Sequence, residues 1–169
     1  MEKKKKIIIA VIVIGSVCIL AVSAGIYTLL SFPIAGEETR IAYITVRTGE
    51  QGCHQEVFLT DFSDEESLSL QDEIIACLQD GRYRGSFDRQ TGSWSMGDAD
   101  IDICFLGNDL SDLRLGRQNL LVKMNGRIYP VKDAEALRKD IYFILKDYGC
   151  LKGLDLPWAA DLQTGGGAQ

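Results

Sequence analysis

The sequence predicts an α+β protein, in which an N-terminal transmembrane helix precedes a small, mainly antiparallel sheet with two helices packed on one face. Three observations support this prediction. Residues 7–30 contain no charged side chain. Several short runs alternate apolar and polar residues between turn signals, and two stretches repeat apolar residues at helical spacing. After the first helix, the predicted order is β-β-α-β-β-β-α.

Residues 7–30 have the length and composition of a membrane span. They hold seven Ile, four Val and three Leu, and as a helix they are about 36 Å long, against roughly 30 Å for the hydrocarbon core. Residues 3–6 are all lysine, and basic residues beside a first span stay in the cytoplasm. We therefore expect a cytoplasmic segment over 1–6, a single pass through the cell membrane over 7–30, and an extracytoplasmic C-terminal domain.

A cleaved secretory signal is the alternative interpretation of this segment. The apolar region of a signal typically has about 7–15 residues, followed by a cleavage site with small residues. Val22, Ser23 and Ala24 offer such a site. The apolar run nevertheless continues to Leu30, where a cleaved signal would already be polar, and this length favours an uncleaved anchor.

The outer domain is expected over residues 39–150, after a stalk over residues 31–38. Residues 40–48 (RIAYITVRT) alternate β-branched and aromatic residues in the manner of a strand. Residues 55–61 (QEVFLTD) follow a turn-rich break and predict the antiparallel return strand.

The first helix of this domain has clear start and stop signals. Ser63 and Glu66 match a capping box, and Gly81 is expected to end the helix. One face of the helix carries the apolar residues Leu70, Ile74, Cys77 and Leu78.

The second half of the domain predicts three strands and a helix. Residues 100–106 (DIDICFL) form the first strand, and two apolar runs flank Asn125-Gly126, the pair that a type I′ hairpin turn favours. Asp133 is expected to cap the last helix and Gly149 to end it. The apolar stripe of that helix consists of Leu137, Ile141, Ile144, Leu145 and Tyr148.

Two segments are predicted to be irregular. Residues 82–97 (RYRGSFDRQTGSWSMG) form either a loop or an irregular hairpin in which Phe87 opposes Trp94. Residues 151–169 are expected to be a C-terminal tail, disordered in part, because they end in TGGGAQ.

The whole arrangement resembles a group of small membrane-anchored proteins. A basic start, one span and a domain that ends in NGRIYPV followed by IYFIL are similar to uncharacterised single-pass proteins of Gram-positive bacteria that hold a domain outside the membrane. This resemblance implies a location, and it brings no catalytic residues with it.

The net charge of the domain limits the kinds of partner that it can bind. Residues 31–169 carry 14 basic and 23 acidic side chains, a net charge of −9. Nucleic acid is therefore not an expected partner, because phosphate contacts need clustered Lys and Arg. The same net charge predicts that the domain stands off anionic headgroups. No G-x-S-x-G, Gly-rich phosphate loop or H-E-x-x-H is present, so neither a catalytic residue nor a cofactor is predicted.

The five cysteines have separate interpretations. Cys18 lies in the span, and Cys77 and Cys104 are expected to be buried free thiols, since free Cys is among the most buried residue types. Cys53 and Cys150 lie in turns outside the membrane, where disulfides are permitted, and are the candidate pair for a bridge.

An acidic cluster offers a possible metal site. Asp98, Asp100 and Asp102 alternate along a predicted strand and would share one face, and Ca²⁺ prefers several oxygen ligands. Strand alternation alone also explains the spacing. In that interpretation the aspartates lie on the solvent face, opposite a core face that holds Ile101, Ile103 and Phe105.

Arginine and aromatic residues gather in the segment over 82–97, and both are enriched in interface anchors. The predicted contact surface consists of Arg82, Tyr83, Arg84, Phe87 and Trp94. The alternative is a loop whose aromatics cover the sheet edge. The sequence thus predicts a non-catalytic binding or accessory module that contacts a protein or envelope partner. A small carboxylate- or metal-dependent envelope enzyme is the alternative.

Overall fold

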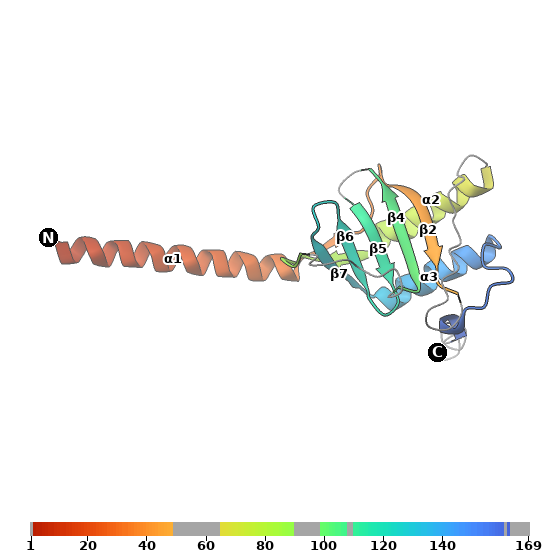
Figure 1. The fold of residues 1–169 in the computed structure, drawn as a ribbon. Helices are drawn as coiled ribbons and strands as arrows, with labels where there is room; N and C mark the ends of the chain where they lie inside the picture. The colour runs from red at the N-terminus through yellow and green to blue at the C-terminus, as the bar shows by residue number, and fades with distance from the viewer. Residues whose placement is uncertain (1, 49–64, 90–98, 108–109, 161, 163–169) are drawn as a thin grey trace, which may run out of the picture.

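The structure is a computed structural model, in which helix α1 (Glu2–Leu29) projects from a two-layer body (Figure 1). The Val11–Leu29 segment is long and apolar enough to cross a membrane, and none of it is buried in the fold. The predicted N-terminal apolar helix is therefore confirmed. The predicted strand over 55–61 and the Ser63 cap lie outside the described residues, which are 2–48, 65–89, 99–107, 110–160 and 162.

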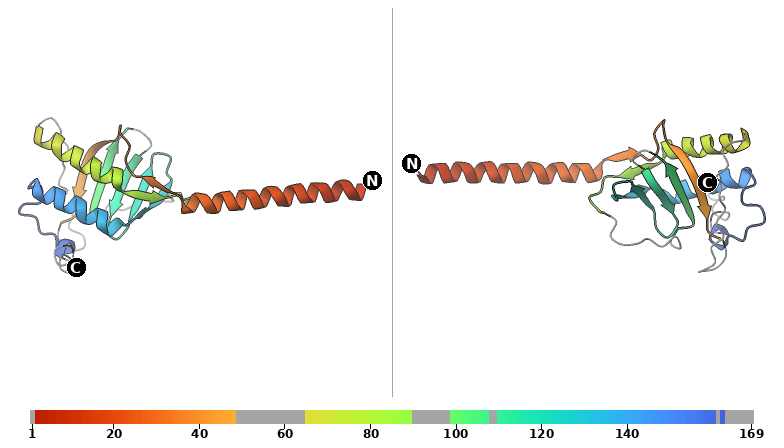
Figure 2. Two further views of the ribbon diagram at one scale, coloured as in Figure 1. Left: turned by 180° about the vertical axis from the view of Figure 1, so that it is seen from behind. Right: turned by 45° about the horizontal axis from the view of Figure 1, so that its top comes forward.

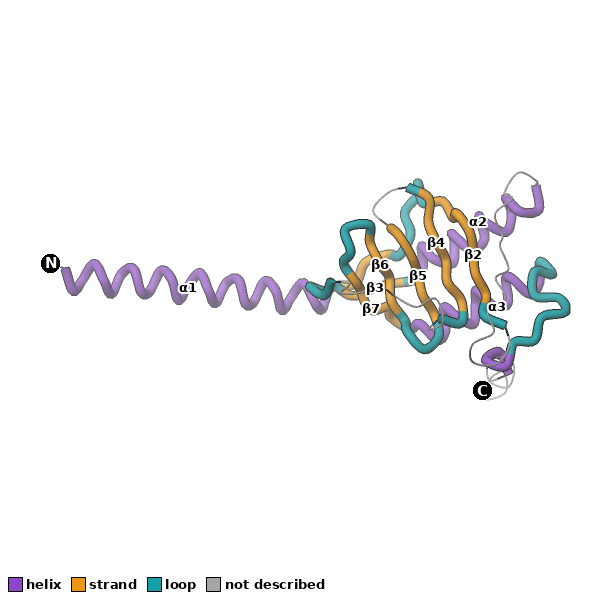
Figure 3. The backbone as a smooth tube through the Cα atoms, in the orientation of Figure 1, coloured by secondary structure: helices purple, strands orange, loops and turns teal. Residues whose placement is uncertain are grey.

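The described residues of the body form one seven-stranded antiparallel sheet (Figure 3). The strand order is β1-β3-β7-β6-β5-β4-β2, so β1 and β2 lie at opposite edges. The strands are β1 (Ser31–Pro33), β2 (Arg40–Val46), β3 (Arg82–Arg84), β4 (Ile101–Leu106), β5 (Leu110–Leu115), β6 (Leu120–Lys123) and β7 (Ile128–Lys132).

Helices α2 (Glu65–Asp80) and α3 (Ala134–Asp147) cover one face of this sheet (Figure 2). Both helices are amphipathic, with an apolar stripe at helical spacing, and each packs this stripe against the strands. The predicted α+β class, with both helices on one face, is confirmed. The most deeply buried core side chains are Ile41, Ile44, Ile74, Leu78, Ile101, Ile103, Leu113, Leu115, Leu121, Ile141, Leu145 and Val46.

Three strands lie where the sequence predicted none. β1 occupies the predicted stalk over 31–38, and the next residues, Ile34 and Ala35, are buried in the core. β3 occupies the start of the predicted irregular segment. β5 escaped prediction because a register shift between Leu110 and Asp112 breaks its alternation.

The turn signals near α3 have mixed outcomes. Asn125-Gly126 lies in the β6–β7 turn as predicted, with Gly126 at φ +74°. The predicted type I′ geometry is wrong, because Asn125 lacks the positive φ that this type requires at both central residues. Gly149 follows α3 at φ +73°, also as predicted. Asp133 precedes α3, but the capping prediction is wrong, because its side chain makes no capping hydrogen bond and its backbone is left-handed.

The described part of the predicted tail packs against the body. Leu151, Ala159 and Leu162 are buried. Trp158, in the 3₁₀ helix η2 (Pro157–Ala159), donates a 2.7 Å hydrogen bond from Nε1 to the carbonyl of Arg47. Apolar side chains and this buried indole donor therefore order a segment that composition alone assigns to a tail.

Candidate functional site: a groove between α2 and α3

The end of α2 and the start of α3 lie side by side because of the strands next to them. Gly81 alone separates α2 from β3, and Asp133 alone separates β7 from α3. The two strands pair with Arg82 opposite Lys132. The helices consequently cross the sheet in opposite directions (Figure 2).

A groove of about 530 Å³ lies on the outer seam of the two helices. Residues at positions i, i+4 and i+7 of α2 face residues at positions i, i+4 and i+8 of α3, so each wall is one helical face. These two sets are Glu73, Cys77 and Asp80, and Ala136, Asp140 and Ile144. The other lining residues are Gly81, Arg82, Lys132, Asp133, Leu137 and Phe143.

Cys77 contributes an apolar rather than a reactive group to the groove. Burial, followed by the charges of Asp140 and Asp80, raises the pKa of its thiol to about 11. Because the thiolate is the nucleophilic form of cysteine, the side chain is protonated at neutral pH. In this state it extends the apolar floor that Leu137 and Ile144 provide.

The charges around this floor are unevenly distributed. Three carboxylates, from Glu73, Asp80 and Asp140, stand along the two helices, and a fourth, from Asp133, lies just before α3. The cations Arg82 and Lys132 lie together at the end where β3 and β7 pair. An apolar floor between acidic walls is complementary to an apolar segment that carries basic side chains.

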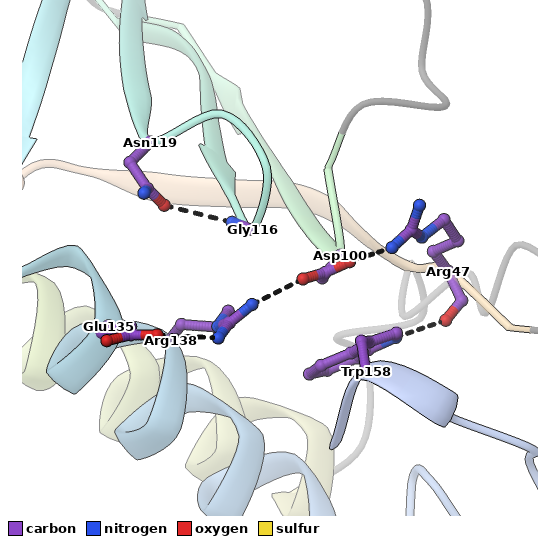
Figure 4. A network of polar contacts seen from close by, with 7 residues as sticks. All are labelled: Arg47, Asp100, Gly116, Asn119, Glu135, Arg138 and Trp158. Carbon is purple, nitrogen blue, oxygen red and sulfur yellow. Dashed lines mark hydrogen bonds and ion pairs between the residues drawn. The ribbon is translucent and has the colours of Figure 1, made fainter. Parts of the chain in front are cut away.

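A second polar site joins the sheet to α3 (Figure 4). The Asp100 carboxylate, whose side chain is 4% exposed, accepts from Arg138 Nη1 at 2.6 Å through Oδ2 and from Arg47 Nη2 through Oδ1. Glu135, 88% exposed, approaches the same Arg138 at 3.5 Å. One buried carboxylate thus pairs with two guanidinium groups, from Arg47 after β2 and from Arg138 of α3, and so links the sheet to the helix.

A third cluster lies on the face of the sheet opposite the helices. Leu113 and Leu115 are fully buried toward the helices, so the alternating Arg114 points the other way, where it meets Asp102 at 3.6 Å. Burial raises the pKa of Asp102 to about 6, and Asp112 adds to this effect while Arg114 opposes it.

Tyr43 and Cys104 adjoin this cluster. A hydrogen bond with Cys104, together with burial, raises the pKa of Tyr43 to about 12. Burial also raises the pKa of Cys104. Both groups therefore stay protonated at neutral pH, and neither is an activated nucleophile.

The two predicted metal ligands that the structure describes, Asp100 and Asp102, do not lie together. Asp98 lies outside the described residues. Asp100 precedes β4 rather than continuing its alternation, and it turns toward α3, whereas Asp102 lies on the other face with Arg114. Among the described residues, no group of three His, Cys, Asp or Glu side chains is placed to hold a metal ion.

The predicted contact residues divide into three groups. Tyr83 is only 8% exposed and packs in the core, so it is not part of a surface. Arg82, Arg84 and Phe87 are exposed, but only Arg84 and Phe87 lie where α1 ends, whereas Arg82 lines the groove opposite Lys132. Trp94 lies outside the described residues.

The structure describes three of the four cysteines that lie outside the apolar helix. Cys77 and Cys104 are free thiols as predicted, although both are half-buried rather than buried. Cys150 is also a free thiol, and its Sγ approaches the carbonyl of Tyr148 at 3.9 Å. The proposed bridge to Cys53 is therefore not formed at Cys150, and Cys53 itself lies outside the described residues.

The groove escaped the sequence analysis, although one signal for it is present. Cys77 and Ile144 belong to the apolar stripes of α2 and α3 but are only half-buried, and Phe143 widens the stripe of α3. An apolar stripe that is wider than the surface buried against the sheet indicates that the helix has a second contact face. No protein-family model, curated protein or solved structure matches the chain.

Proposed function

We propose that the chain is a single-pass membrane protein whose extracytoplasmic body is a non-catalytic binding module, and that the groove between α2 and α3 takes the partner. The groove is the observation that carries this proposal. Its volume of about 530 Å³ falls in the range of roughly 300–1,000 Å³ typical of ligand sites. The partner is a protein or envelope component that presents an apolar segment with basic side chains.

Two features support the anchored topology. No residue of the Val11–Leu29 segment is buried in the described fold, and only its last turn contacts the body, through Tyr27. An apolar helix that is otherwise exposed is stable in lipid rather than in water. The lysines at residues 3–6 and the acidic body favour a cytoplasmic N-terminus.

Protease treatment of intact cells tests this topology. The body should be degraded without lysis, and chain isolated from the membrane fraction should retain residues 1–24 by mass. A body that is degraded only after lysis would contradict the topology. Cleavage after Ala24 would instead identify the segment as a signal sequence.

Site-specific photo-cross-linking tests the groove. A photoreactive side chain at Ala136, in the groove, should form a covalent adduct in intact cells, and the same group at Glu135, one position away on the solvent side, should not. The Ala136 adduct should disappear when Asp140→Lys reverses one wall charge. Equal adducts from positions 135 and 136 would contradict the assignment.

A carboxylate-dependent enzyme is the second candidate, and one observation favours it. Asp102 is buried beside Asp112 with its pKa raised to about 6, and perturbed carboxyl groups are enriched at catalytic sites. Thermal unfolding with Ca²⁺ or Mn²⁺ tests the metal-dependent form, since an ion at 100 times its Kd would add about 2.7 kcal/mol to the free energy of unfolding. No shift in the unfolding temperature would count against it.

A further inference from the structure

The body is joined to α1 without a spacer. Leu30 alone separates the helix from β1, whose Ser31 pairs with Arg84 of β3. The backbone N–H of Gly85 donates to the Leu30 carbonyl at 3.3 Å. A side chain at position 85 would collide with the backbone of Tyr27, so glycine permits the close approach of the last helical turn to the sheet edge.

Aromatic rings fix the level at which the body meets α1. The ring of Tyr27 lies 5.2 Å from that of Phe87 and 6.0 Å from that of Phe32. Tyr27 stands two residues before the end of the apolar segment at Leu29, a rise of about 3 Å along a helix. Phe87, 59% exposed, is therefore held at the depth where the apolar segment ends.

The same edge of the body is basic. Residues 84–89 contain two arginines and one aspartate, although residues 31–169 have a net charge of −9. Arg89 forms a β-bridge with Arg127, which adds a third arginine to this edge. Acidic residues lie at the far end, since α2 starts there with Glu65 and Glu66 (Figure 2).

We infer that this edge, composed of Arg84, Phe87, Arg89 and Arg127, is a docking surface for the anionic headgroups of the membrane that α1 crosses. The inference rests on the proposed anchoring of α1. The exposed aromatic ring enters the interfacial layer, where aromatic side chains are favoured, and the arginines contact lipid phosphates beside it. The body then lies on the bilayer, contrary to the expectation from net charge, and the groove leads away from the membrane surface.

Hydrogen exchange of the full chain in lipid nanodiscs tests this inference. In discs that contain phosphatidylglycerol, amides of residues 85–89 should exchange more slowly than in discs of phosphatidylcholine alone. Each basic residue near an anionic surface strengthens association about fivefold, so Arg84→Gln with Arg89→Gln should weaken docking about 25-fold and remove the difference. Lys146→Gln with Lys152→Gln removes two exposed charges at the far end of α3 and should preserve the difference.

Two further measurements distinguish failure of the docking surface from failure of the membrane anchor. Raising the salt concentration to 1 M should remove the difference in the unaltered chain, because salt screens contacts with headgroups. Amides of α1 report on insertion in both kinds of disc. Protected α1 amides with no lipid dependence at residues 85–89 would overturn the docking surface alone, whereas exchange of α1 as fast as in solution would overturn the anchor and the docking surface together. Equal loss in the control variant would also overturn the inference.

Discussion

Asp100 and Asp102 are two positions apart, yet their carboxylates occupy opposite electrostatic environments. Asp100 lies between Arg47 and Arg138, whereas Asp102 has one arginine partner at 3.6 Å and Asp112 nearby. The Asp100 carboxylate is stabilised by two cations. Burial destabilises the charged form of the Asp102 carboxylate. The two residues therefore respond differently to substitution and to pH.

Asp100→Asn should destabilise the fold by about 3 kcal/mol, because two largely buried guanidinium groups lose their counter-charge. Urea denaturation followed by circular dichroism measures the change. Glu135→Gln removes the exposed partner of the same Arg138 and should change the free energy of unfolding by less than about 0.5 kcal/mol. Equal effects of the two substitutions would contradict a structural role for Asp100.

Asp102 should make the stability of the fold depend on pH. Its pKa rises on folding from 3.8 to about 6, so between these values the folded state binds the proton more tightly than the unfolded state does. The binding of this proton therefore stabilises the folded state fully below about pH 4, and this stabilisation is lost as the pH rises through 6. From pH 4 to 7, the free energy of unfolding of the unaltered chain should fall relative to Asp102→Asn by up to about 3 kcal/mol. Parallel pH profiles of the two proteins would contradict the assignment.

At the scale of elements, the edge strand β2 receives side-chain hydrogen bonds at or beyond both of its ends. Near one end, the N–H of Ile41 donates to Gln71 Oε1 of α2 at 2.9 Å, and beyond the other end the carbonyl of Arg47 accepts from Trp158. Unpaired backbone groups at a sheet edge invite pairing with another chain. These two side chains from different elements satisfy groups that the sheet leaves unpaired.

Gln71→Met keeps the shape of the side chain and removes the acceptor for Ile41. The buried N–H is then left without its partner, which should cost about 1–3 kcal/mol. Gln79→Met, at an exposed position of the same helix, should change stability by less than about 0.5 kcal/mol. Thermal or urea unfolding of both variants measures the difference, and comparable losses would contradict the edge-covering role.

The sequence predicts the elements with regular apolar spacing or clear turn signals, and it fails on strands that are too short or too irregular to show such spacing. α2, α3, β4 and the β6–β7 hairpin follow from apolar spacing and turn chemistry. β1 and β3 each span three residues, too few to display an alternation, and they form because they pair with each other and with β7. Their existence depends on tertiary contacts.

The groove could not be predicted for a related reason. Cys77 and Ile144 lie in helices far apart in the chain, and only the pairing of Arg82 with Lys132 sets those helices side by side. The residue types of the contact surface over 82–97 could be recognised from sequence, but not that Tyr83 points into the core. The spacing of apolar residues within a helix or strand predicts which of its faces is buried. Which element packs against that face depends on the order of the strands in the sheet.

At the scale of the whole molecule, a single residue, Leu30, connects the apolar helix α1 to the sheet of the body. The apolar helix ends at Leu29, and the sheet begins at Ser31. The ring of Tyr27 and the carbonyl of Leu30 contact the segment that follows β3. We therefore expect the helix and the sheet to move together at this point.

Inserting Gly-Ser-Gly-Ser between Leu30 and Ser31 should uncouple the helix from the sheet. The Gly85 amide would lose the Leu30 carbonyl as its acceptor, so its hydrogen exchange should accelerate while amides of the β4–β5 pair stay protected. The same insertion after Gly153, in an exposed turn, should leave the Gly85 amide unchanged. An unchanged Gly85 amide in the first variant would contradict rigid coupling.

The single-residue link also determines how two copies would face each other. Because Leu30 allows little independent swivel, rotation of α1 about its long axis turns the sheet through the same angle. Two chains with their apolar helices in contact would therefore present their grooves at a mutual angle set by which faces of the helices touch.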